Sequence, residues 1–95
     1  MMYSLEEAPP ITTNRTRLEI LASVLGVAHS GALKTHIMYK ANLSHKQLEK
    51  YLKFLKTKGL LEEVPESYET GRFYRVTEKG IQFLKDYARV SDHLD

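Results

Sequence analysis

The chain has 95 residues, a formal net charge of +2 and no cysteine. A chain of this length forms one small domain, and without cysteine it can hold neither disulfides nor thiolate-bound metals. No apolar run reaches the roughly eighteen residues that span a membrane, and the N-terminus is acidic where a signal peptide would be basic. We therefore expect a soluble, cytoplasmic protein.

Positive charge is concentrated in one part of the chain. Residues 14–59 contain nine Lys or Arg and two Glu, which is a net charge of +7. The segments 1–13, 60–76 and 77–95 carry net charges of −2, −2 and −1. A module with such an excess attracts a polyanion even though the whole chain is nearly neutral.

The N-terminal part of the chain combines an arm with a first helix. Residues 1–13 contain two prolines and no sustained period, so we expect an arm there. Residues 14–29 carry apolar side chains at helical spacing, and Thr16 with Glu19 forms a capping-box signal. Arg15 and Arg17 lie in the first turn, where the helix dipole disfavours cations. Their position suggests an anion nearby, and the alternative is two solvated arginines.

A helix-turn-helix pattern follows the first helix. We expect an extended stretch at residues 31–33 as an edge strand, and then a short helix over Lys34–Ala41. Asn42 tolerates the left-handed conformation that a tight turn requires, and the next helix begins directly after Leu43. In such a pair the first helix crosses the DNA backbone, which would place Lys34, Thr35, His36 or Lys40 near phosphate.

Residues 44–58 predict the recognition helix of this pair. Ser44 with Gln47 forms a second capping-box signal. One face of the predicted helix is apolar, and the opposite face is basic. The apolar positions are Leu48, Tyr51, Leu52 and Leu55, and the opposite ones are Lys46, Lys50, Lys53 and Thr57. The basic face suits phosphates or base edges, and the alternative is an ordinary solvated face.

Two strands and a final helix complete the predicted fold. The strands are expected at Leu60–Val64 and Arg72–Val76, joined by a loop over residues 65–71, with Tyr74 and Val76 facing the core. Phe73 then points the other way, and the sequence assigns it no contact. The last helix is expected over Thr77–Asp92, with Thr77 as its cap. Its apolar positions continue past what a small domain can cover, which predicts a homodimer contact through Leu84, Tyr87, Ala88, Ser91 and Leu94.

The chain resembles the winged-helix family from Asn14 onward, and two stretches carry the likeness. K-T-H-I-M-Y-K-A-N-L-S, followed by QLEKYLKFLKTKGLL, is similar to archaeal winged-helix regulators. It is similar in particular to the ten-kilodalton archaeal DNA-binding proteins that dimerise through an antiparallel C-terminal coiled coil. Y-R-V-T-E-K-G resembles the junction between wing and helix in winged-helix repressors.

The resemblance implies a mostly helical α+β fold with a winged-helix domain over residues 14–80 and a dimerisation helix over 81–95. It also implies a homodimer whose recognition helix enters the major groove through Ser44, His45, Lys46, Gln47, Lys50 and Lys53. This chain departs from the family in two ways. Its hairpin carries Glu62, Glu63, Glu66 and Glu69 where a DNA-gripping wing is usually basic, so a wing contact is expected only through Arg72, Arg75 or Tyr68. Its last helix is also shorter than in the coiled-coil members.

No motif indicates an enzyme, a metal site or a cofactor. The four histidines have no metal-ligand spacing, the five glycines occur singly, and Ser44 and His45 face different ways on a helix. We expect a nucleoid-associated double-stranded DNA-binding protein that regulates transcription as a homodimer. The alternatives are a winged-helix module that contacts proteins in a transcription assembly, which the acidic hairpin and the low net charge favour, and an abundant DNA-packing protein.

Overall fold

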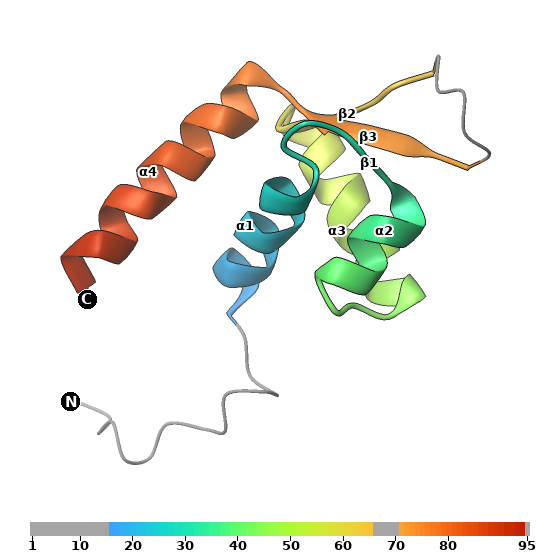
Figure 1. Ribbon diagram of the computed structural model, residues 1–95. Helices are drawn as coiled ribbons and strands as arrows, with labels where there is room; N and C mark the ends of the chain where they lie inside the picture. Colours follow the sequence, from blue (N-terminus) through green and yellow to red (C-terminus); the bar gives the residue numbers. More distant parts are fainter. Residues whose placement is uncertain (1–15, 66–70, 95) are drawn as a thin grey trace.

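A computed structural model of the chain describes residues 16–65 and 71–94 (Figure 1). The predicted arm, Asn14, Arg15 and most of the hairpin loop lie outside the described residues. The described elements confirm the mostly helical α+β fold. In chain order they are α1 (Arg17–Val27), β1 (Ala32–Leu33), α2 (Lys34–Lys40), α3 (His45–Thr57), β2 (Leu61–Glu63), β3 (Phe73–Val76) and α4 (Glu78–Leu94).

Both predicted capping boxes are present. The Thr16 hydroxyl accepts a hydrogen bond from the Glu19 amide at 3.0 Å, and the Glu19 carboxylate accepts one from the Thr16 amide at 2.9 Å. The same reciprocal pair joins Ser44 and Gln47 at 3.1 and 2.9 Å. Each box satisfies two amides that a helix start leaves without partners. α3 therefore begins where its sequence predicts, whereas α1 spans Arg17–Val27 within the predicted range 14–29.

Two backbone positions set the ends of the helix-turn-helix. Asn42 has a φ of 57° between α2 and α3, and Gly59 has a φ of 74° directly after the C-cap residue of α3. Asparagine and glycine are the residues that adopt this left-handed conformation at least cost. The predicted turn and the predicted end of the recognition helix are therefore confirmed.

The sheet has three antiparallel strands in the order β1-β3-β2, so residues 32–33 form the predicted edge strand. Tyr74 and Val76 face the core, as their alternation predicted. Phe73 pairs with Leu33 across the sheet, and its ring lies over Gly31. A Cβ atom at Gly31 would stand 2.7 Å from that ring, so the ring packs closely here because residue 31 has no side chain. This is the contact of Phe73 that the sequence did not assign.

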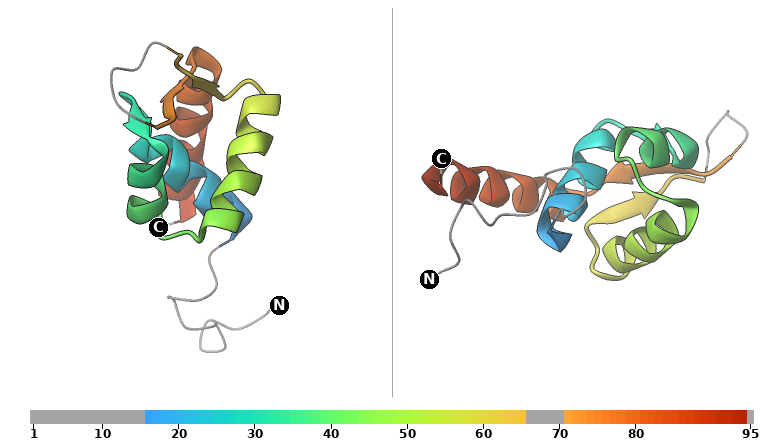
Figure 2. Two further views of the ribbon diagram at one scale, coloured as in Figure 1. Left: turned by 90° about the vertical axis from the view of Figure 1, so that its right-hand side faces the viewer. Right: turned by 90° about the horizontal axis from the view of Figure 1, so that it is seen from below.

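The core lies where α1, α2 and α3 gather against the small sheet (Figures 1 and 2). α4 leaves β3, runs beside α1 and extends its C-terminal half away from the other helices (Figure 1). None of the described helices is both long and apolar enough to cross a membrane. The side chains buried most completely are Val24, Leu25, Ile37, Leu48, Leu52, Leu55 and Tyr74.

The start of α4 is fixed by a close backbone contact. The Thr77 hydroxyl accepts a hydrogen bond from the Gly80 amide at 3.1 Å and donates one to the Gly59 carbonyl at 2.6 Å. A Cβ atom at Gly80 would collide with the Leu60 carbonyl oxygen and stand 2.5 Å from Cγ1 of Val76. The absence of a side chain at this position therefore allows α4 to pack against β3 and the end of α3.

We predict that Gly80→Ala lowers the free energy of unfolding by about 1–3 kcal/mol, because a backbone carbonyl cannot move aside as a flexible side chain can. Gly26→Ala is the matched control, since a Cβ there would meet nothing within 4 Å. It should raise stability by about 0.5–1 kcal/mol, the usual preference of a helix for alanine. Urea unfolding of both variants checks this, and equal stabilities would contradict the contact.

Candidate nucleic-acid interface

The exposed face of α3 is set by the leucines on its other side. Leu48, Leu52 and Leu55 are 0%, 2% and 0% exposed. Lys46, Lys50 and Lys53 lie on the opposite side of a helix with 3.6 residues per turn, and all three are exposed. Among the residues that the structure describes, none of these lysines has an ion-pair or hydrogen-bond partner. Their ammonium groups are therefore available to an external anion.

The other residues at the start of α3 are already engaged within the protein. The side-chain oxygen of Gln47 accepts a hydrogen bond from the Ser44 amide, so this oxygen is already used by the helix cap. Nε2 of His45 lies 3.3 Å from Nζ of Lys34 and 3.8 Å from Oε2 of Glu49, and the ring is 70% exposed. The His45 ring and the Gln47 amide nitrogen remain available for base edges.

Lys34 does not project toward solvent as its predicted role would require. Its ammonium group pairs with Glu49 of α3, and its side chain is only 15% exposed. The pair joins the first residue of α2 to the middle of α3 and holds the two helices of the helix-turn-helix together. Thr35 and Arg17, in contrast, are exposed.

The wing is held to α3 by ion pairs that the sequence did not reveal. Glu63 on β2 lies 3.0 Å from the Lys56 ammonium and 3.2 Å from Nε of Arg72, while Nη1 of Arg72 lies 3.9 Å from Glu49. Glu62 pairs with Arg75 at 3.1 Å, its direct neighbour across the sheet. The strand register would have indicated the Glu62 pair, because oppositely charged residues that face each other across two strands attract.

These contacts lower the pKa of the Glu63 carboxyl group. Hydrogen bonds from Arg72 and then from Lys56 stabilise the carboxylate and hold its pKa below the ordinary value of 4.5. Glu63 in turn raises the pKa of the Arg72 guanidinium. The acidic residues of the described part of the wing are thus neutralised by neighbouring cations and do not form a free acidic surface.

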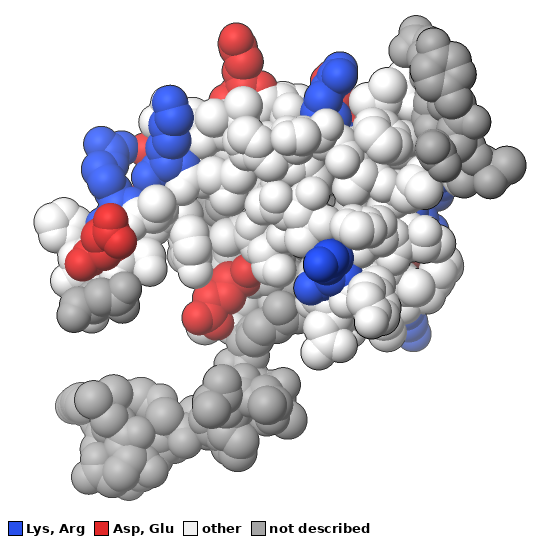
Figure 3. Space-filling view, viewed as in Figure 1, with Lys and Arg blue, Asp and Glu red and all other residues white. Residues whose placement is uncertain are grey.

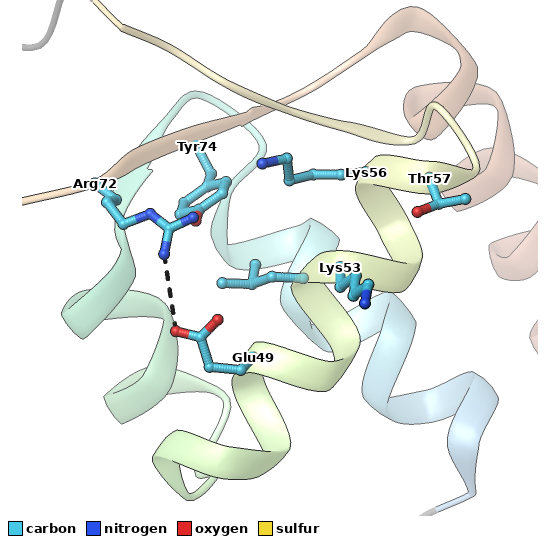
Figure 4. A pocket seen from close by; sticks show the side chains of 7 residues that line it. Glu49, Lys53, Lys56, Thr57, Arg72 and Tyr74 are labelled. Carbon is cyan, nitrogen blue, oxygen red and sulfur yellow. Dashed lines mark ion pairs between the residues drawn. The ribbon is translucent and has the colours of Figure 1, made fainter.

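A concavity of about 270 Å³ lies between α3 and the base of the wing (Figure 4). Its wall includes three cations, Lys53, Lys56 and Arg72, together with Glu49, Leu52, Thr57 and Tyr74. The Tyr74 ring descends from β3 beside the Arg72 guanidinium, and Lys56 reaches toward it from α3 (Figure 4). The basic face of α3 thus continues into a basic hollow beneath the wing.

The face seen in Figure 3 is different. α2 lies in front of α3 in that view, and the surface is mostly uncharged, with scattered charged side chains and a group over α4 (Figures 1 and 3). Figure 2 shows α3 on the opposite side of the domain from α2. Among the described residues, no three His, Asp or Glu side chains form a cluster that could hold a metal ion.

The predicted dimer residues differ in their exposure along α4. Leu84 is half-buried and packs against the domain's own core, so its side chain already has a partner inside the chain. Tyr87 and Ser91 are half-buried, whereas Ala88 is exposed and Leu94 is 82% exposed. The part of α4 after Leu84 therefore carries the apolar surface that the domain itself does not cover.

We predict that Glu63→Gln lowers stability only where the Glu63 carboxylate is charged. Its folded-state pKa is depressed, so its stabilisation is fully present above about pH 4.5 and is lost as the pH falls through the folded-state value. The side chain is 32% exposed, which limits the effect to below about 1 kcal/mol. Urea unfolding at pH 7 and pH 3 checks this, with Asp92→Asn as a control. A difference as large at pH 3 as at pH 7 would contradict the ion-pair origin.

Several solved structures share this fold. The DNA-binding protein Sso10a-2 from Sulfolobus solfataricus superposes with a TM-score of 0.70 and 23% identity, over 84% of this chain and 85% of that one. MepR, a transcription regulator of a Staphylococcus aureus multidrug efflux pump, gives 0.70 and 18% identity, over 79% of this chain and 58% of its own. RosR from H. salinarum gives 0.68 and 19% identity, over 83% and 76%. At these identities the likeness concerns the fold.

Sequence comparison identifies the family. An uncharacterized protein of Methanocaldococcus jannaschii is 31% identical over 70 residues, which are 64% of this chain and 72% of that protein. The family model described as winged helix-turn-helix matches residues 14–94. The resemblance drawn from the motifs is thereby confirmed, and the chain belongs to the winged helix-turn-helix family.

Proposed function

We propose that this protein binds double-stranded DNA as a homodimer and regulates transcription, with α3 in the major groove and no catalytic activity. The observation that carries the proposal is the row of Lys46, Lys50 and Lys53, which are exposed on one side of α3 and unpaired within the described residues. Cations without internal partners are free to replace the counterions of a DNA backbone.

Each residue of the interface has a role that follows from its position. Lys46, Lys50 and Lys53 bind phosphates, and His45 and Gln47, at the helix start, are placed to read base edges. Thr35 on α2 and Arg17 on α1 are exposed and supply further backbone contacts, with Ser44 fixing the start of α3. Lys34 supports the interface from inside through Glu49 and is not itself a contact.

Ion pairs in the described part of the wing weaken one argument for a protein partner. The acidic hairpin and the low net charge favour a protein-interaction module, yet Glu62 and Glu63 each pair with an arginine and Glu63 also with a lysine. Among the similar structures is a complex of MepR with DNA, with a TM-score of 0.68 and 19% identity, covering 79% of this chain and 64% of that one. A fold shared with a protein solved in complex with DNA supports DNA binding by this chain.

The exposed apolar residues of α4 after Leu84 favour a homodimer. Ala88, Val90 and Leu94 are exposed, with Val90 and Leu94 at 53% and 82%, on a helix that extends away from the other helices (Figure 1). We assign the contact to Tyr87, Ala88, Ser91 and Leu94, with Leu84 at its inner edge. A symmetric dimer of this kind presents two α3 helices to half-sites spaced by about one turn of DNA, roughly 34 Å, or a multiple of it.

We predict that replacing Lys46, Lys50 and Lys53 together by Ala weakens the salt dependence of DNA binding. Six phosphate contacts in a dimer give a log–log slope of roughly −5, and the triple variant should flatten it by half or more. The melting temperature should change little, because all three side chains are exposed. Fluorescence anisotropy with a random duplex between low and moderate salt measures the slope.

Lys85→Ala with Arg89→Ala is the control for the lysine variant, since it removes two exposed cations from α4. Its slope should equal that of the wild type. If the triple variant keeps the wild-type slope, α3 does not contact the DNA. If the wild type does not bind DNA below about 10 µM at low salt, the result favours the protein-interaction module.

We predict that Ala88→Glu weakens the dimer, because it places a charge inside the proposed contact. His93→Glu adds the same charge to an exposed position on another side of α4 and should leave the dimer intact. Sedimentation equilibrium of the two variants and the wild type measures the association constant. A monomeric wild type, or equal association of the two variants, would contradict the assigned contact.

A further inference from the structure

The hydroxyl of Tyr74 stands out among the buried polar groups of the protein. Tyr74 is 0% exposed, and its hydroxyl is the buried side-chain polar atom that has no hydrogen-bond partner within the described residues. Leaving a buried hydroxyl without a partner costs free energy, and folded proteins rarely do so. A phenylalanine would fill the same space without that cost. The hydroxyl therefore points to a partner outside the described residues.

Tyr74 lines the concavity between α3 and the wing, beside groups that donate hydrogen bonds (Figure 4). The Arg72 guanidinium lies 5.8 Å from the centre of the Tyr74 ring and gives its Nε and Nη2 hydrogen bonds to Glu63. Nη1 of Arg72 is 3.9 Å from Glu49, beyond hydrogen-bond distance, so it keeps donors for another acceptor. Lys53, Lys56 and the Thr57 hydroxyl complete the donor set.

The two carboxylates of this region do not cancel its positive charge. Glu49 is compensated by Lys34, and Glu63 by Lys56 and Arg72. With Lys53 added, four cations face two carboxylates, which leaves a net charge of +2. The carboxylates also hold Arg72 and Lys56 in place, so the donors are oriented before any ligand arrives.

We propose that this concavity is a binding site for a phosphate group, held by Arg72, Lys53, Lys56 and the hydroxyls of Thr57 and Tyr74. Donors from five side chains exceed what the two oxygens of a carboxylate use, whereas a phosphate offers three or four acceptor oxygens. The volume of about 270 Å³ is several times the roughly 30 Å³ of one water, so a phosphate with attached atoms fits.

The phosphate comes either from the DNA backbone beside α3 or from a free phosphate ion or ester. If the phosphate belongs to DNA, this inference rests on the proposed function and adds a contact to it. Binding of a free phosphate ion or ester would be independent of DNA. In both cases the chemistry of the site is the same, and the test begins without DNA so that the site and the proposed function fail separately.

The test is a titration of the full, ¹⁵N-labelled protein with inorganic phosphate, at an ionic strength held constant with chloride. We expect saturable shifts of the amide signals of Thr57, Arg72 and Tyr74. Tyr74→Phe should weaken binding about tenfold, which corresponds to about 1.4 kcal/mol. Its free energy of unfolding should equal or exceed that of the wild type, because the variant removes an unpartnered hydroxyl.

Thr57→Val is the second variant, and Lys85→Ala, on exposed α4, is the control that should bind phosphate as the wild type does. The absence of saturable shifts, or equal affinity of the wild type and Tyr74→Phe, would overturn the proposal. A loss of stability in Tyr74→Phe would also overturn it, because it would mean that the hydroxyl has a partner inside the protein.

The DNA arm of the test identifies the source. If a backbone phosphate occupies the site, saturating inorganic phosphate at constant ionic strength should lower the DNA affinity of the wild type several-fold and that of Tyr74→Phe much less. If the site takes free phosphate, the amide shifts persist and DNA affinity stays unchanged. Either result supports the site, and absent amide shifts count against it whatever the DNA arm gives.

Discussion

The orientation of α3 depends on the burial of three leucines. Leu48, Leu52 and Leu55 enter a core built with α1, α2 and the sheet, and each contributes about 1.5–3 kcal/mol when fully buried. Rotating α3 about its axis would expose these side chains, so the opposite face is fixed by the same packing. The positions of Lys46, Lys50 and Lys53 in space are a consequence of where the leucines lie.

Charge is divided between two tasks around this helix. Lys34, Lys56 and Arg72 pair with Glu49 and Glu63 and join α2, α3 and the wing into one surface. The lysines farther around the helix have no such partners among the described residues and remain available to a ligand. Although the net charge of the chain is only +2, cations that form internal ion pairs and cations available to a ligand lie next to each other on this surface.

The features that the sequence predicted correctly are local ones. Capping boxes, the Asn42 turn and the Gly59 helix end each depend on residues within a few positions of one another, as does the alternation that buries Tyr74. The inward turn of Lys34 toward Glu49, fifteen residues away, depends on how α2 packs on α3. Local patterns do not contain such contacts, which arise only when the chain has folded.

The same distinction applies to the wing and the hollow beneath it. The sequence shows the carboxylates of the hairpin without their partners. The strand register pairs Glu62 with Arg75, whereas Glu63 pairs with Arg72 and with Lys56 of α3. The sequence likewise does not show the contact of Phe73 with Gly31. Nor does it show that the Tyr74 hydroxyl is buried with no partner among residues 16–65 and 71–94. The role of α3 in binding was predicted from its pattern and remains a proposal.

Lysine footprinting by mass spectrometry tests the central claim most directly, because it reports each ammonium group separately. The protein is acetylated briefly with and without a saturating random DNA duplex, and the modification of every lysine is compared. We predict several-fold protection of Lys46, Lys50 and Lys53 and unchanged modification of Lys85. Equal modification of the three α3 lysines in both states, or protection confined to Lys85, would contradict it.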